Sequence, residues 1–257
     1  MKNKIYDSPE KAVADIPDGA TLLLGGWGGP GGYPSYLTIA LAELGCKNLT
    51  VVHNTGGQFS WGELDKRGVE WVDHGILFAN KQVKKLVCSF PVIRTAKRIK
   101  QPYVEDQWKA KELEIEVHPQ GTLAEKIRCG GAGLGGFWNP VGPGTVWETG
   151  KEKRVINGRE HVLDTPLRGD FALIRAQKAD KFGNLVYHGI TRTFNAIMAT
   201  AADVTIVEAD EIVELGEIGP QDIITPGVYV DRIVKRPDRP DQYQKYCELI
   251  WAKHTTK

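Results

Sequence analysis

TLLLGGWGGPGGYPSYLTIALAELGCKNLTVV, residues 21–52, is the segment that most clearly indicates the fold. It opens with the apolar run Thr21–Leu24, which is typical of a buried strand, and continues with a glycine-rich segment over 25–32. A helical pattern then covers 35–44 before a second strand pattern at 49–52. Strand, loop, helix and strand in this order form a βαβ unit, which predicts a parallel sheet with a right-handed crossover.

The same alternation recurs downstream and predicts an α/β fold. We expect an open, mostly parallel sheet flanked by helices, with the whole chain, 1–257, as one domain. Further strands are expected at 85–89, 113–117, 171–176, 185–188 and 204–208. Further helices are expected near 92–99, 104–110, 121–128 and 193–201, and a first helix follows Asp7 or Ser8, either of which can cap it.

Two stretches interrupt this pattern. Residues 130–150 are rich in glycine and proline, so we expect an irregular loop shaped to let a ligand approach closely. Residues 151–164 centre on Asn157-Gly158, a dipeptide suited to a type I′ turn, and predict a solvent-facing hairpin inserted at about 150–165. The tail, 236–257, is polar and rich in proline before a last short helix.

Composition argues against several kinds of function. The chain has 33 Lys and Arg against 32 Asp and Glu, so no strong field would attract nucleic acid, and its seven Trp are scattered. Residues 1–14 contain no apolar signal-peptide core, and no run approaches the roughly 18 apolar residues that a membrane span needs. We therefore expect a cytoplasmic protein that binds neither nucleic acid nor membranes.

The cysteines and histidines are not spaced as metal ligands, so we predict no metal site. The four cysteines form no C-x-x-C pair and are interpreted as reduced, mostly buried thiols, and the six histidines form no H-x-x-x-H pair. The residues concerned are Cys46, Cys88, Cys129 and Cys247, and His53, His74, His118, His161, His188 and His254.

The glycine segment formally matches a dinucleotide-binding fingerprint, because 26–31 reads G-x-G-x-x-G between a strand and a helix. Two features argue against a nicotinamide cofactor. Pro30 removes a backbone N–H, and the second strand ends in His53-Asn54, without the acid that would hold a ribose hydroxyl. What remains is a glycine loop at the carboxyl end of the first parallel strand, where open α/β sheets bind their ligands.

The second informative segment is HPQGTLAE, residues 118–125, where a strand is expected to end and a helix to begin at once. A neutral amide at this position, Gln120, could donate a hydrogen bond to a developing oxyanion without adding charge. The residues alone leave open the alternative that Gln120 only caps or bridges the turn.

The surroundings of Gln120 carry a family resemblance. The segment PQGTLAEKIR, 119–128, followed by Gly130-Gly131-Ala132-Gly133 and the pair Phe137-Trp138, closely resembles the signature of family I coenzyme A transferase alpha subunits. Nearly the whole chain takes part in the resemblance. Further matching segments are 25–28 with Pro34, 48–52, 169–176, 179–184, 192–195, the region from 207 to 214, and 220–223.

The resemblance implies a sugar-phosphate-isomerase-like α/β fold and an enzyme that moves CoA between an acyl-CoA and a carboxylic acid. In this family a glutamate attacks the thioester and passes through a mixed anhydride to a glutamyl-CoA thioester. That glutamate lies in a Glu-Asn-Gly motif of the beta subunit, and this chain contains no such triplet. The resemblance therefore implies a beta partner, as a heterodimer or an α2β2 assembly. It implies no permanently bound cofactor, with a CoA thioester as substrate.

The resemblance also assigns site residues. By position, Gln120 matches the glutamine that the family places near the thioester carbonyl to hold the oxyanion. Two glycine segments are implied to approach the acyl group and thioester, with backbone N–H groups as donors. The implied substrate-binding residues are Gly28, Gly29, Gly31, Gly32, Asn54, Gly130, Gly131, Ala132 and Gly133.

Two departures from the family leave the acyl substrate open. Members that act on small 3-oxoacids carry an NNAG-like stretch, where this chain has NTGGQFSWGE, residues 54–63. Aromatic residues are also gathered around the expected mouth, where they could line a pocket for a larger acyl group or belong to a subunit interface. They are Trp27, Tyr33, Tyr36, Phe59, Trp61, Phe137 and Trp138.

Alternative functions and an alternative nucleophile also stay open. Relatives of this fold that lose the glutamate use water instead, which would make the chain part of an acyl-CoA hydrolase. A non-catalytic binding subunit is the third possibility, because fold alone does not give function. Glu63 follows the second strand and could be proposed as a nucleophile, but Gly62 and Leu64 do not reproduce the family motif.

Overall fold

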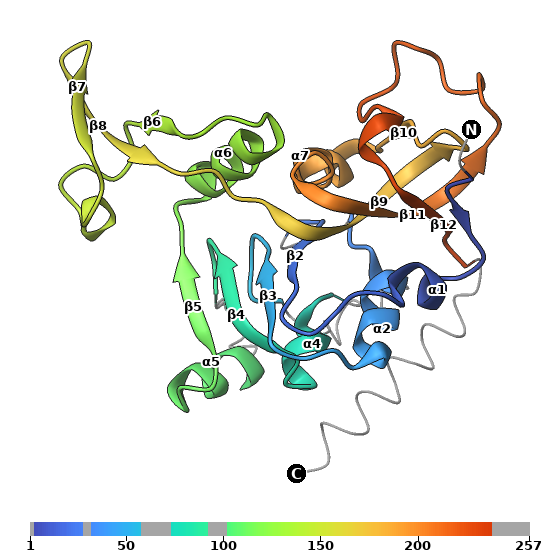
Figure 1. The fold of residues 1–257 in the computed structure, drawn as a ribbon, viewed down its shortest axis with the longest axis horizontal. Coiled ribbons are helices and arrows are strands. Elements are labelled where there is room, and N and C mark those ends of the chain that lie inside the picture. Colours follow the sequence, from blue (N-terminus) through green and yellow to red (C-terminus); the bar gives the residue numbers. More distant parts are fainter. Residues whose placement is uncertain (1–2, 28–31, 58–72, 92–101, 238–257) are drawn as a thin grey trace.

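The computed structural model describes residues 3–27, 32–57, 73–91 and 102–237. Within these residues the chain forms a nine-stranded sheet and a separate three-stranded sheet (Figure 1). The strands are β1 Ile5–Tyr6, β2 Thr21–Leu24, β3 Leu49–Val52, β4 Val83–Cys88, β5 Glu114–Val117, β6 Phe137–Asn139, β7 Lys153–Ile156, β8 Arg159–Asp164, β9 Gly169–Asp180, β10 Leu185–Val186, β11 Ala202–Val213 and β12 Arg232–Lys235. The α-helices are α1 Pro9–Val13, α2 Ser35–Leu44, α4 Gly75–Ala79, α5 Pro102–Lys109, α6 Gln120–Gly131 and α7 Thr193–Met198.

The large sheet has the order β1-β12-β11-β9-β2-β3-β4-β5, with all of these neighbours parallel and β10 added antiparallel to β9. From β2 the chain runs outward through β3, β4 and β5, and then returns on the other side of β2 as β9. The direction of winding therefore reverses between β2 and β9. In open α/β sheets this reversal is the place where ligands bind, at the carboxyl ends of the strands. The predicted open, mostly parallel sheet is confirmed.

Helices cover both faces of the large sheet (Figure 1). Alternate residues of β2 show the two faces, because successive side chains of a strand point to opposite sides. Leu22 and Leu24 pack in one buried cluster with α1, α2 and α4, whereas Leu23 packs in a second cluster with α6 and α7. Each face thus has its own core, which explains the continuous apolar run of β2.

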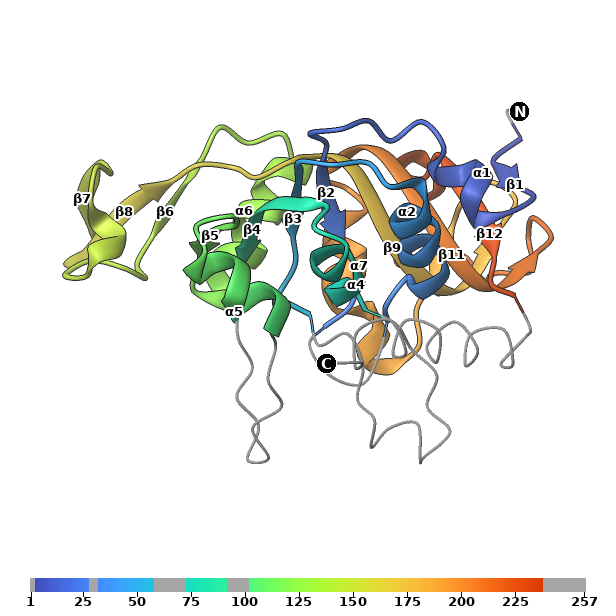
Figure 2. The same ribbon diagram turned by 90° about the horizontal axis from the view of Figure 1, so that it is seen from below.

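The three-stranded sheet, β6-β8-β7, lies beyond β5 and α6, at the far end of the molecule from the N-terminus, as Figure 2 shows. Its β7–β8 turn has φ of +51° at Asn157 and +76° at Gly158, the positive values that a type I′ turn requires. The residues of β7 and β8 nearest the turn are mostly exposed, whereas β8 becomes buried towards Asp164. The hairpin prediction is confirmed.

Most predicted elements are present, and the main error concerns residues 130–150. The Ser8 side chain caps α1 by accepting from the Lys11 N–H at 3.3 Å, as expected. The prediction of an irregular loop over 130–150 holds for 132–136, 140–145 and 149–150. It was wrong elsewhere, because Gly130 and Gly131 form the last turn of α6, and β6 and the short helix Val146–Glu148 follow. The predicted helix at 92–99 and the tail after 237 lie outside the described residues.

Candidate functional site

The N-terminus of α2, which follows the glycine segment, is closed by a side chain from across the sheet. Glu208 on β11 is fully buried, and its Oε2 atom accepts the backbone N–H groups of Tyr36 at 2.7 Å and Leu37 at 3.2 Å. These are the N–H groups that a dinucleotide pyrophosphate would use at a helix N-terminus. Their engagement by Glu208 agrees with the sequence argument against a nicotinamide cofactor.

The glycine segment is also tied to the sheet by Asn195 on α7. Its Oδ1 atom accepts the Arg175 N–H at 3.0 Å, and its Nδ2 atom donates to the carbonyls of Gly32 at 2.9 Å and Thr191 at 2.7 Å. A Cβ at Gly25 would lie 1.8 Å from Asn195 Oδ1, so only glycine fits there. Asn195 therefore fixes both ends of the loop that leads from β2 to α2. The family resemblance included this residue without giving it a role.

Two buried histidines support the segment that follows β3. The Thr55 N–H donates to His53 Nδ1 at 3.0 Å, and His74 Nε2 lies 2.7 Å from the Thr55 carbonyl oxygen. Burial, together with the neighbouring His74, lowers the pKa of His53 well below its usual value, and burial also lowers the pKa of His74. The neutral form of both rings is therefore favoured, and both rings contact Thr55 in the turn after Asn54. No local sequence signal had indicated this structural role.

Asn54 and Gln120 meet at the carboxyl edge of the sheet. The Asn54 carbonyl accepts the N–H groups of Ser89 at 3.1 Å and Phe90 at 3.0 Å, which fixes its backbone beside the end of β4. Gln120 begins α6 directly after β5 and reaches over β4 to donate from Nε2 to Asn54 Oδ1 at 2.8 Å. Asn54 is 3% exposed and Gln120 is half-buried. The pairing joins two residues that were predicted from the sequence to share one site.

The N-terminus of α6 is open, in contrast to that of α2. The first intrahelical acceptor is the Pro119 carbonyl, which takes the Leu123 N–H at 2.9 Å. Within the described part of the chain, no partner accepts the N–H groups of Gln120, Gly121 and Thr122. The first turn contains no acidic residue, and a Cβ built at Gly121 meets nothing within 4 Å. This end of the helix carries a partial positive charge and faces free space, which suits an anion or a developing oxyanion.

The other predicted substrate-binding residues are not gathered at Gln120. Gly130 and Gly131 lie at the opposite end of α6, about 15 Å along a helix that rises about 1.5 Å per residue. A Cβ would lie 2.2 Å from the Leu167 carbonyl oxygen at Gly130 and 2.1 Å from Thr200 Oγ1 at Gly131, so these glycines allow close helix packing. Ala132 and Gly133 follow, and their N–H groups donate to the carbonyls of Arg128 and Gly130. The substrate-binding role that the resemblance gives to these residues stays a prediction.

Some predicted residues cannot be placed. Gly28, Gly29 and Gly31, like Phe59, Trp61 and Glu63, lie outside the described residues. Gly32 is described, and its carbonyl is held by Asn195.

The expected aromatic mouth is divided between two places. Tyr33 is buried against His53, with ring centroids 5.7 Å apart, and it supports the glycine segment from within. Phe137 and Trp138 lie on β6 of the three-stranded sheet, where the Arg154 guanidinium covers the Trp138 ring at 4.5 Å. Phe137 and Trp138 are on a different sheet from the strand that precedes Tyr33, because β6 pairs with β8 and not with the large sheet. The two alternatives for the aromatic residues, a pocket lining and a subunit interface, stay predictions.

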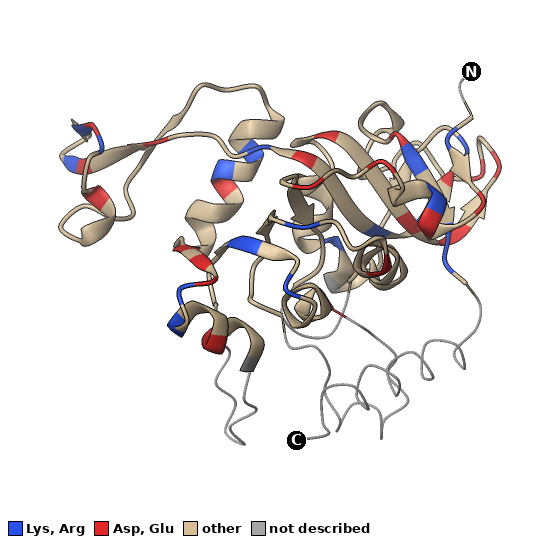
Figure 3. Cartoon of the chain, turned by 60° about the horizontal axis from the view of Figure 1, so that its bottom comes forward, with Lys and Arg blue, Asp and Glu red and all other residues tan. Residues whose placement is uncertain are grey.

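Several classes of site are not seen in the described residues. They contain no group of three or more His, Cys, Asp or Glu side chains placed to hold a metal, and none of their helices has the length and apolarity of a membrane span. Cys46, Cys88 and Cys129 are buried free thiols. Lys and Arg are interspersed with Asp and Glu over the described elements (Figure 3).

The fold is that of an α/β protein of the doubly wound kind, with the candidate site at the carboxyl edge of a parallel sheet. The sequence profile described as "Coenzyme A transferase" matches residues 6–236, and the chain belongs to this family.

Relatives of matching length are similar along most of the chain. The chain is 44% identical over 235 residues to the A subunit of the 3-oxoadipate CoA-transferase of Pseudomonas putida, an alignment that covers 91% of this chain and 94% of the relative. It is 41% identical over 242 residues to the A subunit of the probable succinyl-CoA:3-ketoacid coenzyme A transferase of Bacillus subtilis, covering 94% of each. These similarities identify the chain as a CoA-transferase subunit of the A type.

A solved structure confirms the fold. The glutaconate coenzyme A-transferase of Acidaminococcus fermentans superposes with a TM-score of 0.75 at 19% identity, over 91% of this chain and 76% of that one.

Proposed function

We propose that this chain is the alpha subunit of a cytoplasmic, heteromeric CoA-transferase in which Gln120 stabilises the oxyanion of the reacting thioester. The observation that carries the proposal is the open N-terminus of α6, with the Gln120 amide beside it and Asn54 fixing the direction of that amide. An amide donor and free backbone N–H groups favour a negative oxygen without adding a charge of their own. The same arrangement supports a binding role for Asn54.

The proposed chemistry begins on a glutamate of the beta subunit. Its carboxylate attacks the thioester carbonyl, and collapse of the oxyanion expels the CoA thiolate and leaves a mixed anhydride. The thiolate then attacks the glutamyl carbonyl, which releases the acid and forms glutamyl-CoA. The incoming acid takes the CoA by the same two steps in reverse. Gln120 would donate to the oxyanion each time a tetrahedral centre forms.

The nucleophile is proposed to lie on a partner because this chain has no Glu-Asn-Gly triplet. The relatives support the placement of the nucleophile on another chain. They are named as single subunits, A, and the alignments cover 94% of each relative. We propose an assembly of two alpha and two beta chains. The hydrolase alternative is not favoured, because both relatives are named as transferases.

The relatives also suggest the substrate class. Their names specify 3-oxoadipate and 3-ketoacids, so we propose that the acceptor is a 3-oxo acid and that succinyl-CoA can serve as donor. The glycine segment, with Gly28, Gly29, Gly31 and Gly32, is proposed to border the acyl group. Asn195, which holds the Gly32 carbonyl at 2.9 Å, would set the position of that border.

The test compares Gln120→Ala with the unmutated chain, each co-expressed with its beta subunit. Succinyl-CoA and acetoacetate are supplied, products are followed by mass spectrometry, and the enzyme is trapped with borohydride or hydroxylamine. We expect acetoacetyl-CoA, a trapped glutamyl adduct on the beta chain, and a loss of about 10²- to 10³-fold in kcat for Gln120→Ala. The matched control is Gln221→Ala, an exposed glutamine far along the chain, which should keep full activity.

Two results would count against the proposal. Release of free CoA without acetoacetyl-CoA or an adduct would indicate a hydrolase. Full activity in Gln120→Ala, with the fold intact by circular dichroism, would remove the oxyanion role and leave Gln120 as a residue of the turn.

A further inference from the structure

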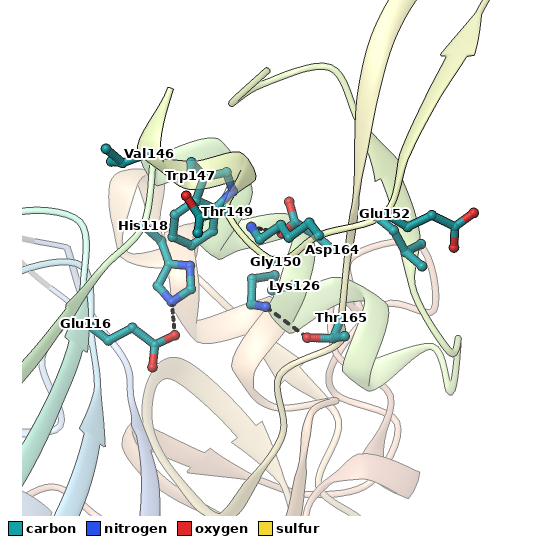
Figure 4. A pocket seen from close by; sticks show the side chains of 12 residues that line it. Glu116, His118, Lys126, Val146, Trp147, Thr149, Gly150, Glu152, Asp164 and Thr165 are labelled. Atoms are coloured by element: carbon teal, nitrogen blue, oxygen red, sulfur yellow. Dashed lines mark hydrogen bonds and ion pairs between the residues drawn. The ribbon is translucent and has the colours of Figure 1, made fainter. Parts of the chain in front are cut away.

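A cavity lies between β5, α6 and the base of the β7–β8 hairpin, and neither Gln120 nor Asn54 lines it. Its volume is about 510 Å³, within the range of about 300–1,000 Å³ that small-molecule sites occupy. Figure 4 shows side chains of His118, Lys126, Trp147 and Asp164 converging on this space, while Val146 and Glu152 point away from its centre. The groups that face the cavity come from four separate segments of the chain.

Lys126 is the unusual group in this cavity. It is 8% exposed, and the one hydrogen bond given by its Nζ atom goes to Thr165 Oγ1 at 3.3 Å. No carboxylate of the described residues lies within 4 Å of this ammonium group. A buried ammonium group without a directly paired carboxylate is costly, and burial lowers the pKa of Lys126, although the more distant charge of Asp164 opposes this.

The carboxylates nearby are already engaged. Asp164 is fully buried and accepts from Lys151 Nζ at 2.6 Å and from Asn139 Nδ2 at 2.6 Å. Glu116 accepts from His118 Nε2 at 2.6 Å and pairs with Lys85 at 2.8 Å. Lys85 also pairs with Glu114 at 2.9 Å, and neither Asp164 nor Glu116 forms an ion pair with Lys126 within 4 Å. Lys126 is therefore the cation of this cavity that has no directly paired carboxylate among the described residues.

The remaining groups fit a carboxylate with a short carbon chain. The Trp147 indole N–H and His118 Nδ1 are buried and have no hydrogen-bond partner among the described residues. Thr149 and Thr165 add hydroxyl groups, whereas Leu163 and the part of the Trp147 ring that is not covered by Lys151 Nζ, 3.4 Å from the ring centroid, provide apolar surface. We propose that this cavity binds the anion of a short-chain carboxylic acid, with its carboxylate on Lys126 and Thr165 and its carbon chain along Trp147.

The test measures binding to the full-length chain by NMR, through the indole N–H resonance of Trp147, which is identified by its loss in Trp147→Phe. Sodium butyrate is titrated at constant ionic strength, with n-butylammonium chloride as a probe of equal size and opposite charge. We expect a saturable shift with butyrate and none with butylammonium. Lys126→Met should weaken butyrate binding about tenfold or more, because a charge-assisted hydrogen bond is lost, while Lys126→Arg should retain it.

The controls separate this site from the one around Gln120. Lys109→Met removes an exposed lysine and should bind butyrate like the unmutated chain, and Gln120→Ala should do the same. Thermal unfolding of each variant confirms that it is folded. Equal binding of butyrate by folded Lys126→Met, binding of butylammonium, or loss of binding in Gln120→Ala would each overturn the proposal. A chain that binds butyrate but transfers no CoA would contradict only the proposed function.

Discussion

The two longest described helices, α2 and α6, both begin at the carboxyl edge of the same sheet, yet their N-termini are treated in opposite ways. At α2 the buried Glu208 accepts the Tyr36 and Leu37 N–H groups, and the Arg236 guanidinium lies 3.7 Å from its other oxygen. At α6 the first turn has no acidic residue and no partner for its N–H groups among the described residues, and the Gln120 amide lies beside it. The N–H groups at the N-terminus of α2 are used to hold the fold together, whereas those at the N-terminus of α6 are available for a ligand.

The contrast between the two helices shows that a glycine-rich loop before a helix does not by itself locate an anion site. The glycine fingerprint precedes α2, whose N–H groups are already used within the protein. The open end belongs to α6, which follows a Pro-Gln-Gly segment. The availability of the N–H groups, and not the glycine count, governs where negative charge can be held.

The largest effect on activity is expected when a carboxylate is placed at the open N-terminus of α6, as Glu208 is placed at the N-terminus of α2. Gly121→Asp places a carboxylate in the first turn, where a Cβ has free space. We expect the loss of acyl transfer to exceed about 10²-fold, because the new charge repels the oxyanion. Stability should be unchanged or higher by about 0.5 kcal/mol, because the carboxylate complements the helix dipole. Steady-state kinetics and urea unfolding of the complex measure the two effects.

Gly121→Ala and Gly121→Asn are the matched controls for this change. Both fill the same space without charge, so activity should stay within about tenfold of the unmutated enzyme. An active Gly121→Asp enzyme would show that the open helix end does not face the reacting oxygen.

The next effect concerns the closed end. Glu208→Ala should lower the free energy of unfolding by about 3 kcal/mol, because two buried N–H groups lose a shared acceptor. Glu208→Gln keeps an oxygen acceptor, so its free energy of unfolding should fall less than that of Glu208→Ala. Glu211→Ala, an exposed glutamate on the same strand, is the control and should change stability by less than about 0.5 kcal/mol. Urea unfolding followed by circular dichroism measures all three, and equal losses for Ala at 208 and 211 would contradict the capping role.

Asn195→Ala should lower the free energy of unfolding by about 2 kcal/mol. The reason is that the Gly32 and Thr191 carbonyls and the Arg175 N–H lose their hydrogen-bond partner. A double-variant cycle with Gly25→Ala, measured by urea unfolding, sharpens this test. The added methyl group would lie 1.8 Å from Asn195 Oδ1, so it should be tolerated better when Asn195 is already alanine. Strictly additive losses would show that Asn195 does not determine the glycine at 25.

The smallest effect concerns β5, the strand that leads to the open end. The hydrogen bond from His118, followed by that from Lys85, lowers the pKa of Glu116 from its usual 4.5 to about 2, although burial opposes it. A carboxyl group with a lowered pKa in the folded state stabilises the protein fully above 4.5 and loses this effect as the pH falls towards 2. In urea unfolding, the advantage of the unmutated chain over Glu116→Gln should therefore shrink as the pH falls from about 6 to about 3. This difference in the free energy of unfolding should stay below about 1 kcal/mol, since the Glu116 side chain is 41% exposed.

Much of the fold could be predicted because its signals are local. The apolar run of β2, the helical period of α2, the Ser8 cap and the Asn157-Gly158 turn each depend on neighbours within a few residues. The strands β1 and β12 were not predicted. They are short, and they pair with each other across most of the chain, Ile5 with Ile233. Gly130 and Gly131 were expected in a loop but end α6, where they allow close contact with Leu167 and Thr200, residues that the local sequence does not contain.

The amino-acid sequence alone established the βαβ pattern, the family resemblance and the prediction that Gln120 is a site residue. Which helix end is open became clear only from the folded arrangement. The hydrogen-bonded partners are far apart in the sequence: Glu208 and Leu37 are separated by 171 residues, Asn195 and Gly32 by 163, and Gln120 and Asn54 by 66. These side chains meet because of the order of strands in the sheet, which differs from the order of residues along the chain. Each buried polar group then requires a partner from whatever the sheet places beside it.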